Sequence, residues 1–216
     1  MAVPHAVTLV VVRHGETVDN VAARIQGQSQ GQLTQRGLAQ AAALGVRLRG
    51  ERFDRVYCSD LARARDTLAC CSVLCDEADV VFSPLLRERS AGVLEGQPMS
   101  AMQDAVTKAA GVSERQWKPE GGESWADVRQ RATTFLTDVS QLGGTTRVLA
   151  VTHGGFIHEL MAAAGVRAPG RPGNTCVNEM LVRRTANGKG ISCTLVVVND
   201  TSHLPPELAG GSDRSA

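Results

Sequence analysis

Short hydrophobic runs alternate with longer amphipathic stretches along most of the chain. Residues 7–12 are rich in β-branched side chains and too few for a typical helix, so they predict a buried strand. A second apolar run, over 147–152, predicts another, and each run leads into a histidine followed by glycine. Shorter runs at 55–59 and 79–86 predict two further strands.

The stretches between these runs have the periodicity of amphipathic helices. One such stretch follows Thr34, and another follows Asp60, which stands where an N-cap belongs. The longest follows Ser124, and Asp127 three residues later makes a start that is similar to a capping box. A further helix is expected to run to about Ala164, directly after the second buried strand.

The order of these elements predicts the fold class. Residues 86–100 are punctuated by glycine and predict a loop, whereas 179–185 and 191–199 predict a late hairpin. Strands that alternate with helices predict an α/β three-layer sandwich: a mostly parallel central sheet with one late antiparallel strand, and helices on both faces. We expect a single domain over 1–216, in which about 205–216 form a loose tail.

Composition narrows the classes of partner. The 23 basic and 22 acidic residues give a net charge of +1, so no bulk field attracts nucleic acid or an anionic membrane. No apolar run approaches the roughly 20 residues that a membrane-spanning helix needs, and the first residues lack the pattern of a signal peptide. The six cysteines show no paired C-x-x-C spacing and predict reduced thiols. We therefore expect a cytoplasmic protein.

Two histidine–glycine turns carry the candidate chemistry. Arg13–Gly15 and His153–Gly155 both follow predicted strands, and ligands of open α/β sheets bind outside the carboxyl ends of the strands. Glycine lets the backbone come close to a ligand, and the helix that begins near Gly154 points N–H groups at an anion. The guanidinium group of Arg13 matches phosphate oxygens. These turns predict one pocket for an anionic group.

A zinc site is the alternative use of these histidines. His153 and His158 are five residues apart, which does not place them on one helical face, and the chain has no His-Glu-x-x-His stretch. We therefore predict no metal site. An isolated histidine is more often a surface or core residue than a catalytic one, so the wider set of motifs decides.

Several motifs follow one another in a recognisable order. They are Arg13-His14-Gly15-Glu16-Thr17 with Asn20, Ser59–Thr67, Leu86-Arg87-Glu88 with Gly92 and Glu95-Gly96, Pro119–Ser124, and Thr152–Gly155. In this order the chain resembles the histidine phosphatase superfamily from about Val7 to Gly155. The remaining segment fits the closing strands of that family.

The resemblance implies a role for each matching residue. His14 would be the nucleophile and Glu88 the general acid, and neither a cofactor nor a metal would be needed. Arg13 and Arg63 would form the phosphate pocket with His153, and their charges would keep His14 neutral and therefore nucleophilic. The implied substrate-contacting set is Arg13, Asn20, Gln26, Gly27, Arg63, Glu88, His153 and Gly154.

The segment from Gly96 to Glu120 bears on the choice between hydrolysis and isomerisation. Cofactor-dependent phosphoglycerate mutases typically carry a longer segment there, rich in arginine and tyrosine. Here it has no tyrosine and contains only Lys108, Arg115 and Lys118 as basic residues. This difference favours a phosphatase, with a phosphoglycerate mutase as an alternative.

Two stretches resemble one branch of the superfamily. Residues 86–96, together with 26–28, are similar to fructose-2,6-bisphosphatases of the TIGAR type, which implies a small phosphorylated metabolite such as a sugar bisphosphate or a bisphosphoglycerate. The connection over 143–151 is short, whereas the vertebrate proteins of that type carry a long insertion there. A broad-specificity phosphatase and a non-catalytic phosphoprotein-binding module are therefore kept as further alternatives.

Overall fold

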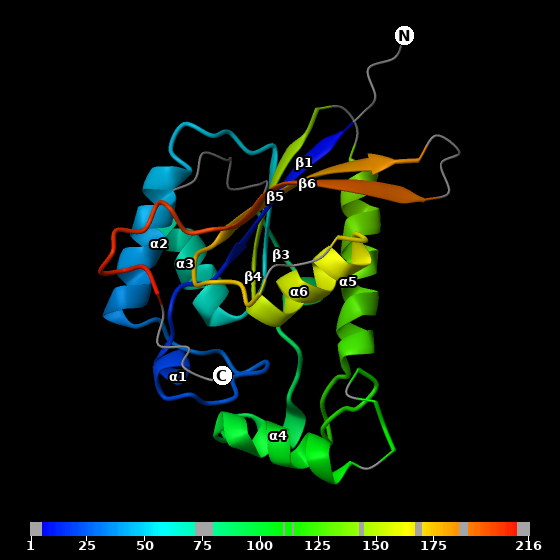
Figure 1. Ribbon diagram of the computed structural model, residues 1–216. Helices are drawn as coiled ribbons and strands as arrows, with labels where there is room; N and C mark the ends of the chain where they lie inside the picture. Colours follow the sequence, from blue (N-terminus) through cyan, green and yellow to red (C-terminus); the bar gives the residue numbers. More distant parts are fainter. Residues whose placement is uncertain are drawn as a thin grey trace.

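A six-stranded sheet with helices on both faces forms the centre of the protein (Figure 1). This arrangement, seen in a computed structural model, confirms the predicted α/β sandwich. The strands are β1 (Val7–Arg13), β2 (Arg55–Cys58), β3 (Val80–Phe82), β4 (Arg147–Thr152), β5 (Val177–Arg184) and β6 (Ile191–Asp200). The structure describes residues 6–71, 80–109, 111–113, 115–142, 145–166, 170–185 and 190–210.

The strand order across the sheet is β3-β2-β4-β1-β5-β6. The pairs β1 with β4, β2 with β4 and β2 with β3 are parallel, whereas β5 is antiparallel to both of its neighbours. Among the described strands β5 therefore alone runs against the others, as predicted for one late strand. The pairing of β5 with β6 also confirms the hairpin, although most of its turn lies outside the described residues.

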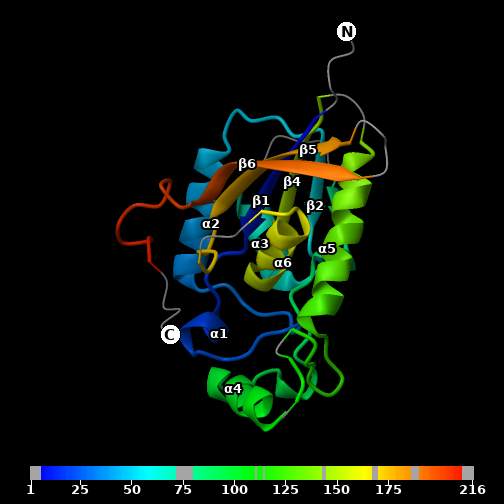
Figure 2. The same ribbon diagram turned by 45° about the vertical axis from the view of Figure 1, so that its right-hand side comes forward.

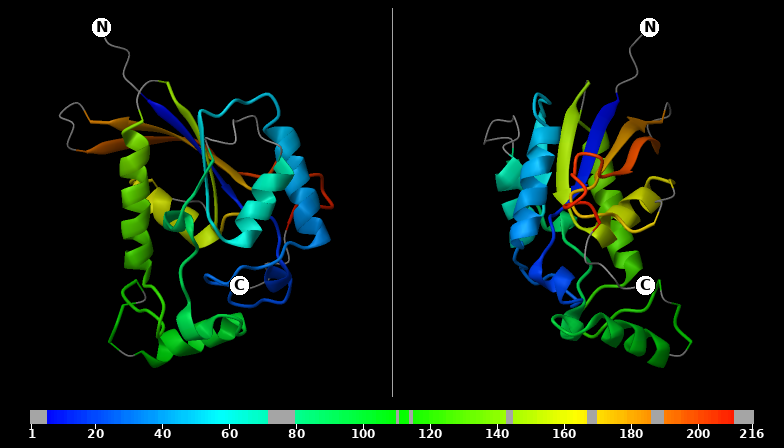
Figure 3. Two further views of the ribbon diagram at one scale, coloured as in Figure 1. Left: turned by 180° about the vertical axis from the view of Figure 1, so that it is seen from behind. Right: turned by 60° about the vertical axis from the view of Figure 1, so that its left-hand side comes forward.

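Two layers of helices cover the sheet. In Figures 2 and 3, α2 and α3 lie on one face, and α5 and α6 lie on the other. The small helices α1 and α4 lie beyond the ends of the strands (Figure 3). The helices are α1 (Val18–Val21), α2 (Gln35–Arg47), α3 (Ala62–Cys71), α4 (Met99–Lys108), α5 (Trp125–Ser140), α6 (Gly154–Ala163) and the 3-10 helices η2 (Pro84–Leu86) and η3 (Gly92–Leu94). No helix in the described ranges is long and apolar enough to cross a bilayer.

The central strand β1 is buried because both of its faces pack on helices. Alternate side chains of a strand point to opposite faces, so Leu9 and Val11 join the core cluster under α5 and α6, whereas Val10 and Val12 join the cluster under α2 and α3. Burial of each such side chain contributes about 1.5–3 kcal/mol. The strand is thereby held at the middle of the sheet, which fixes the position of the residues that follow it.

Helix caps confirm two of the predicted starts. Thr34 caps α2 by accepting a hydrogen bond from the backbone N–H of Gly37. At the start of α5, Ser124 and Asp127 form a complete capping box, each side chain accepting the backbone N–H of the other. These caps satisfy N–H groups that have no partner inside the helix.

The start of α3 and the extent of β3 differ from the prediction. The helix begins at Ala62, so Asp60 is not its N-cap; the N–H of Ala62 donates instead to the side chain of Gln30. The carboxylate of Asp60 forms an ion pair with Arg87. The predicted strand over 79–86 is shorter because Pro84 cannot continue a strand ladder and begins η2.

Part of the expected tail is held against α2. The carbonyl group of Leu208 accepts a hydrogen bond from the side chain of Gln40, and that of Ala209 accepts one from Arg36. Leu204, just before this segment, is buried. Residues 205–210 thus pack on the helical layer, whereas 211–216 lie outside the described residues.

Candidate active site

The two histidine–glycine turns meet at adjacent strand ends. Arg13 and Thr152 are register partners in the parallel pair of β1 and β4, and the N–H of His14 donates to the carbonyl of Thr152 at 3.0 Å. His14 and His153 therefore follow the last paired positions of the two strands, and their ring centroids lie 5.1 Å apart. Both side chains are almost fully buried, with 3% and 0% exposed.

The ring of His14 has a defined orientation. Its Nδ1 atom lies 2.7 Å from the carbonyl oxygen of Gly15. A carbonyl oxygen only accepts hydrogen bonds, so Nδ1 carries the proton and the lone pair of the neutral ring is on Nε2. Burial, followed by the positive charges of Arg63 and Arg13, lowers the pKa of His14 well below 6.5. The ring is therefore a neutral imidazole with a lone pair available to attack an electrophile.

His153 uses both of its ring nitrogens within the protein. The Nε–H of Arg63 donates to Nδ1 at 3.2 Å, which leaves the ring proton on Nε2, 2.8 Å from the hydroxyl oxygen of Ser59. Burial and then the charge of Arg63 lower the pKa of His153 well below 6.5. In this arrangement His153 orients Arg63 and packs against His14, and its predicted contact with phosphate stays a prediction.

The guanidinium group of Arg63 is held by a neighbouring loop. It donates to the carbonyl oxygens of Gly27 at 2.9 Å and Ser29 at 2.6 Å. Burial lowers the pKa of Arg63 to about 10, so the group remains a cation at neutral pH. Arg13, at the end of β1, donates to the carbonyl of Pro172 at 2.7 Å. Both guanidinium groups line the same pocket as His14.

Glu88 enters the site from the segment between η2 and η3. One carboxylate oxygen accepts the N–H of Gly155 at 2.9 Å, and the other accepts the N–H of Arg89 at 2.8 Å. The side chain lies so close to α6 that a Cβ atom at Gly155 would overlap Glu88 Oε1 and lie 2.9 Å from the ring of Trp125. A side chain at this position would displace the carboxylate of Glu88 or the ring of Trp125, so the second glycine of the His153 turn allows Glu88 to lie against α6.

These residues surround one pocket of about 860 Å³. It is lined by every member of the substrate-contacting set except His153, namely by Arg13, Asn20, Gln26, Gly27, Arg63, Glu88 and Gly154. Asn20 also has a local role, because its side chain completes the capping box of α1 with Thr17. The structure therefore brings the predicted residues together, with His153 directly behind His14.

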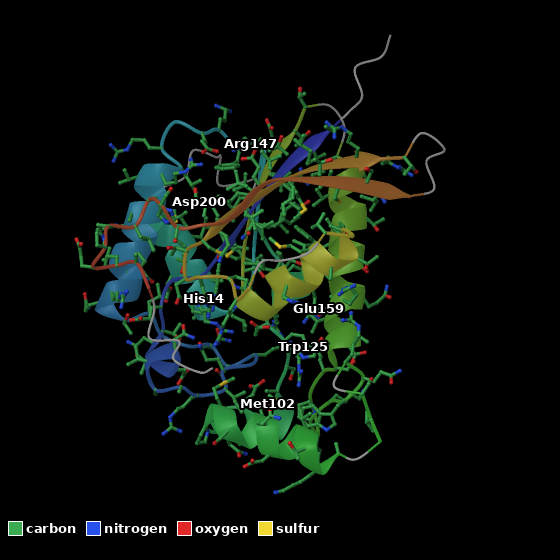
Figure 4. All side chains as sticks on the ribbon, in the orientation of Figure 1. His14, Met102, Trp125, Arg147, Glu159 and Asp200 are labelled. Carbon is green, nitrogen blue, oxygen red and sulfur yellow. The ribbon has the colours of Figure 1, made fainter. Side chains whose placement is uncertain are left out.

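The outer part of the pocket contains residues that the sequence did not single out. Met99, Met102 and Val106 come from α4, and Trp125 begins α5. Figure 4 shows Met102, Trp125 and Glu159 on three different helices, with Met102 toward the lower end of the molecule and Trp125 between it and Glu159. No local sequence pattern identifies these residues, because nothing in the sequence near α4 predicts that this helix returns to the strand ends.

Comparison with known proteins gives a match to one family model, described as the histidine phosphatase superfamily (branch 1), over residues 9–199. A metal-independent phosphoserine phosphatase of Arabidopsis thaliana is 35% identical over 181 residues, covering 81% of this chain and 76% of that protein. The fructose-2,6-bisphosphatase TIGAR of Bos taurus is 39% identical over 138 residues, covering 62% of this chain and 51% of that protein. A mycobacterial glucosyl-3-phosphoglycerate phosphatase is 30% identical, with a TM-score of 0.73 over 91% of this chain and 100% of that chain.

Proposed function

Because the chain is a phosphomonoesterase of the histidine phosphatase superfamily (branch 1), we propose that it hydrolyses a small phosphorylated metabolite through a phosphohistidine on His14. The observation that carries this assignment is the hydrogen bond from Nδ1 of His14 to the carbonyl of Gly15. It leaves Nε2 without a proton in a pocket that also contains Arg13, Arg63 and Glu88. A neutral nucleophile, two cations and one carboxyl group are the groups that phosphoryl transfer requires.

In the first step Nε2 of His14 forms a bond to phosphorus while the bond from phosphorus to the ester oxygen breaks. Glu88, in its protonated form, gives its proton to the departing oxygen. The guanidinium groups of Arg13 and Arg63 stabilise the negative charge on the transferring group. Backbone carbonyl groups already hold both side chains in place, so no reorganisation is needed when the charge develops. The products of this step are an alcohol and a phosphorylated His14.

In the second step the carboxylate of Glu88 accepts a proton from water, and the water oxygen bonds to phosphorus. The bond between phosphorus and Nε2 breaks, inorganic phosphate leaves, and His14 recovers its lone pair. The same carboxyl group thus serves first as an acid and then as a base. Its two backbone donors, Gly155 and Arg89, keep it beside the pocket in both steps.

We further propose that the substrate carries a second anionic group, as fructose 2,6-bisphosphate or a bisphosphoglycerate does. The likeness to TIGAR supports this choice. Four guanidinium groups outside the His14 centre also line the pocket, those of Arg24, Arg89, Arg115 and Arg171. Arginine is well suited to a phosphate group because it donates two parallel hydrogen bonds.

A second candidate is a bulkier phosphomonoester with an apolar portion. Ile25, Met99, Met102, Val106 and Trp125 give the same pocket an apolar wall, and thioether and indole groups pack well against flat rings. A volume of about 860 Å³ is within the range of pockets that hold drug-sized ligands. Comparison of kcat/KM for sugar bisphosphates, phosphoglycerates, phosphoserine and nucleotide monophosphates distinguishes the two candidates. A monophosphoglycerate that is isomerised faster than it is hydrolysed would indicate a mutase.

Trapping of the phosphoenzyme tests the reaction itself. Brief incubation with a substrate labelled at phosphorus, followed by rapid denaturation, should leave an acid-labile label on the protein, and His14→Ala should carry none. Removal of the nucleophile should reduce turnover of p-nitrophenyl phosphate by several orders of magnitude. Wild-type turnover by His14→Ala would contradict the assignment. Absence of turnover in both proteins would instead indicate a phosphoprotein-binding module.

A further inference from the structure

An arginine on α5 has all of its hydrogen-bond donors occupied, three by the segment that carries Glu88 and two by Glu123. Arg131 donates through one terminal nitrogen to the carbonyl oxygens of Leu85 at 2.6 Å and Arg87 at 3.0 Å. Its other terminal nitrogen donates to the carbonyl of Glu88 at 3.4 Å and to Glu123 at 2.9 Å. The Nε–H donates to the second oxygen of Glu123 at 2.8 Å. A guanidinium group has five N–H donors, and this one uses every one of them.

Glu123 completes the connection from the other side. The carboxylate oxygen that receives the terminal nitrogen of Arg131 also accepts the N–H of Ser90 at 2.9 Å and the side-chain amide of Gln28 at 3.2 Å. The pair thus contacts the backbone at 85, 87, 88 and 90, on both sides of Glu88. Only 17% of the Arg131 side chain and 22% of the Glu123 side chain are exposed, so water screens the pair only partly.

The backbone around Glu88 has little regular secondary structure to hold it in place. Glu88 lies between two 3-10 turns and outside any strand or α-helix, so no regular ladder of hydrogen bonds fixes its backbone. The two backbone N–H groups that its carboxylate accepts, from Arg89 and Gly155, fix the side chain only relative to the segment and to α6. The segment is also held at Leu86, whose carbonyl accepts the hydroxyl of Thr152 at 2.6 Å, and at Arg87, which pairs with Asp60. At Glu88 itself the backbone carbonyl accepts from Arg131 on α5 and from Gln28, whose amide also donates to Glu123.

We propose, on the basis of the role assigned above to Glu88, that Arg131 and Glu123 are positioning residues for proton transfer. Neither Arg131 nor Glu123 lines the pocket, and both act by holding the backbone that carries the acid. Displacement of a reacting group by about 1 Å costs on the order of 10²-fold in rate. Arg131 and Glu123 therefore determine how well the leaving oxygen is protonated.

Leaving-group dependence separates positioning from general structural support. Phosphoryl transfer to His14 needs a proton donor when the leaving group is an alkoxide, and much less when it is p-nitrophenolate. For Arg131→Gln and Glu123→Gln, kcat/KM for an alkyl phosphate such as phosphoserine should fall about 10- to 100-fold. The value for p-nitrophenyl phosphate should change little. Arg131→Lys keeps the positive charge but lacks the planar guanidinium group with its five donors, so it should show the same selective loss.

The control variant is Arg147→Gln, which removes an ion-paired arginine at the other end of the sheet. Arg147 contacts Glu51 and Glu179, and Figure 4 shows it at the opposite end of the molecule from Met102. Its loss should leave the ratio of the two kcat/KM values unchanged at 25 °C. Melting temperatures of all variants identify any that are unfolded, and only folded variants are compared.

Glu88→Gln provides the reference for the loss of the acid. In that background Arg131→Gln should have no further effect on the ratio, because nothing remains to be positioned. Equal losses for both substrates, a wild-type kcat/KM for the alkyl phosphate in Arg131→Lys, or an additional effect of Arg131→Gln in the Glu88→Gln background would overturn the positioning role. If Glu88→Gln itself shows no leaving-group dependence, the assignment of the acid is wrong, and that failure is distinct from the failure of the positioning role.

Discussion

The proposed nucleophile, His14, and His153 behind it are two buried imidazoles beside guanidinium groups. Burial and the charge of Arg63 oppose protonation of both His14 and His153, so the folded protein binds protons there only well below pH 6.5. An unfolded chain binds them near that pH. The arrangement that keeps His14 nucleophilic therefore also makes the folded state sensitive to acid.

The free energy of unfolding should accordingly fall as the pH falls below 6.5. In this window the unfolded chain binds more protons than the folded one, so each of His14 and His153 contributes a loss of up to about 1.4 kcal/mol per pH unit until its folded-state pKa is reached. Urea unfolding at a series of pH values measures the slope. His14→Asn should make it shallower, and an unchanged slope would show that His14 is not the titrating group.

A single added atom at Gly155 would change the position of the Glu88 carboxyl group. In Gly155→Ala the new Cβ would overlap Glu88 Oε1, so the carboxylate must move away from α6. We expect a selective loss of kcat/KM for alkyl phosphates of about 10- to 100-fold. Gly190→Ala is the control, since its Cβ would lie 3.4 Å from Thr185 in ordinary contact. Equal rates for the two variants would mean that Glu88 does not act from its observed position.

At the scale of elements, the N-caps of α2 and α5 should contribute differently to the free energy of unfolding. Ser124→Ala removes one hydrogen bond, to the N–H of Asp127, and should lower the free energy of unfolding by about 1 kcal/mol. Thr34→Ala should cost more, because the hydroxyl of Thr34 also donates to the buried carboxylate of Glu16. Thermal unfolding measures the order, and a larger effect at Ser124 would contradict it.

The elements that the sequence predicts well are those with strong local signals. β1, β4, α2 and α5 combine buried runs or clear periodicity with caps, and their bounds agree closely with the prediction. By contrast α4 was not predicted, because it has no side-chain cap and none of its residues is buried. Asp60 was misassigned because its partner, Arg87, is close only in the folded chain.

The candidate site follows the same division. The histidine turns lie where strand ends predict them, and their local chemistry is legible in the sequence. The residues that contact the backbone around Glu88 cannot be predicted from the sequence, because Arg131 is more than 40 residues away from residues 85–88 in the chain. Long-range hydrogen bonds produce no periodic pattern in the sequence, so the residues proposed to position Glu88 could be identified only in the structure.

At the scale of the whole molecule, the segment that follows β6 is hydrogen-bonded to α2, far from it in the sequence. Gln40 is 1% exposed and connects Leu208 to the backbone N–H of Glu16, two residues from His14. A chain that ends at Leu204 should lose the bonds to Gln40 and Arg36, each worth about 1 kcal/mol. Its melting temperature should be lower by several degrees.

The matched control for this truncation is a chain that ends at Gly210. It keeps the carbonyl groups of Leu208 and Ala209 and should melt close to the full-length protein. Equal melting temperatures for the two shortened chains would show that the segment adds nothing to stability.

The two walls of the pocket are anchored very differently. His14, with His153 behind it, extends from the pair of strands β1 and β4 in the fully packed middle of the sheet, whereas Met99, Met102 and Val106 belong to a helix without a buried residue. Amide hydrogens of α4 should therefore exchange with deuterium long before those of β1, because local opening requires little free energy where few contacts are broken. Mutations accumulating in that helix would alter which esters are accepted and leave the transfer chemistry intact.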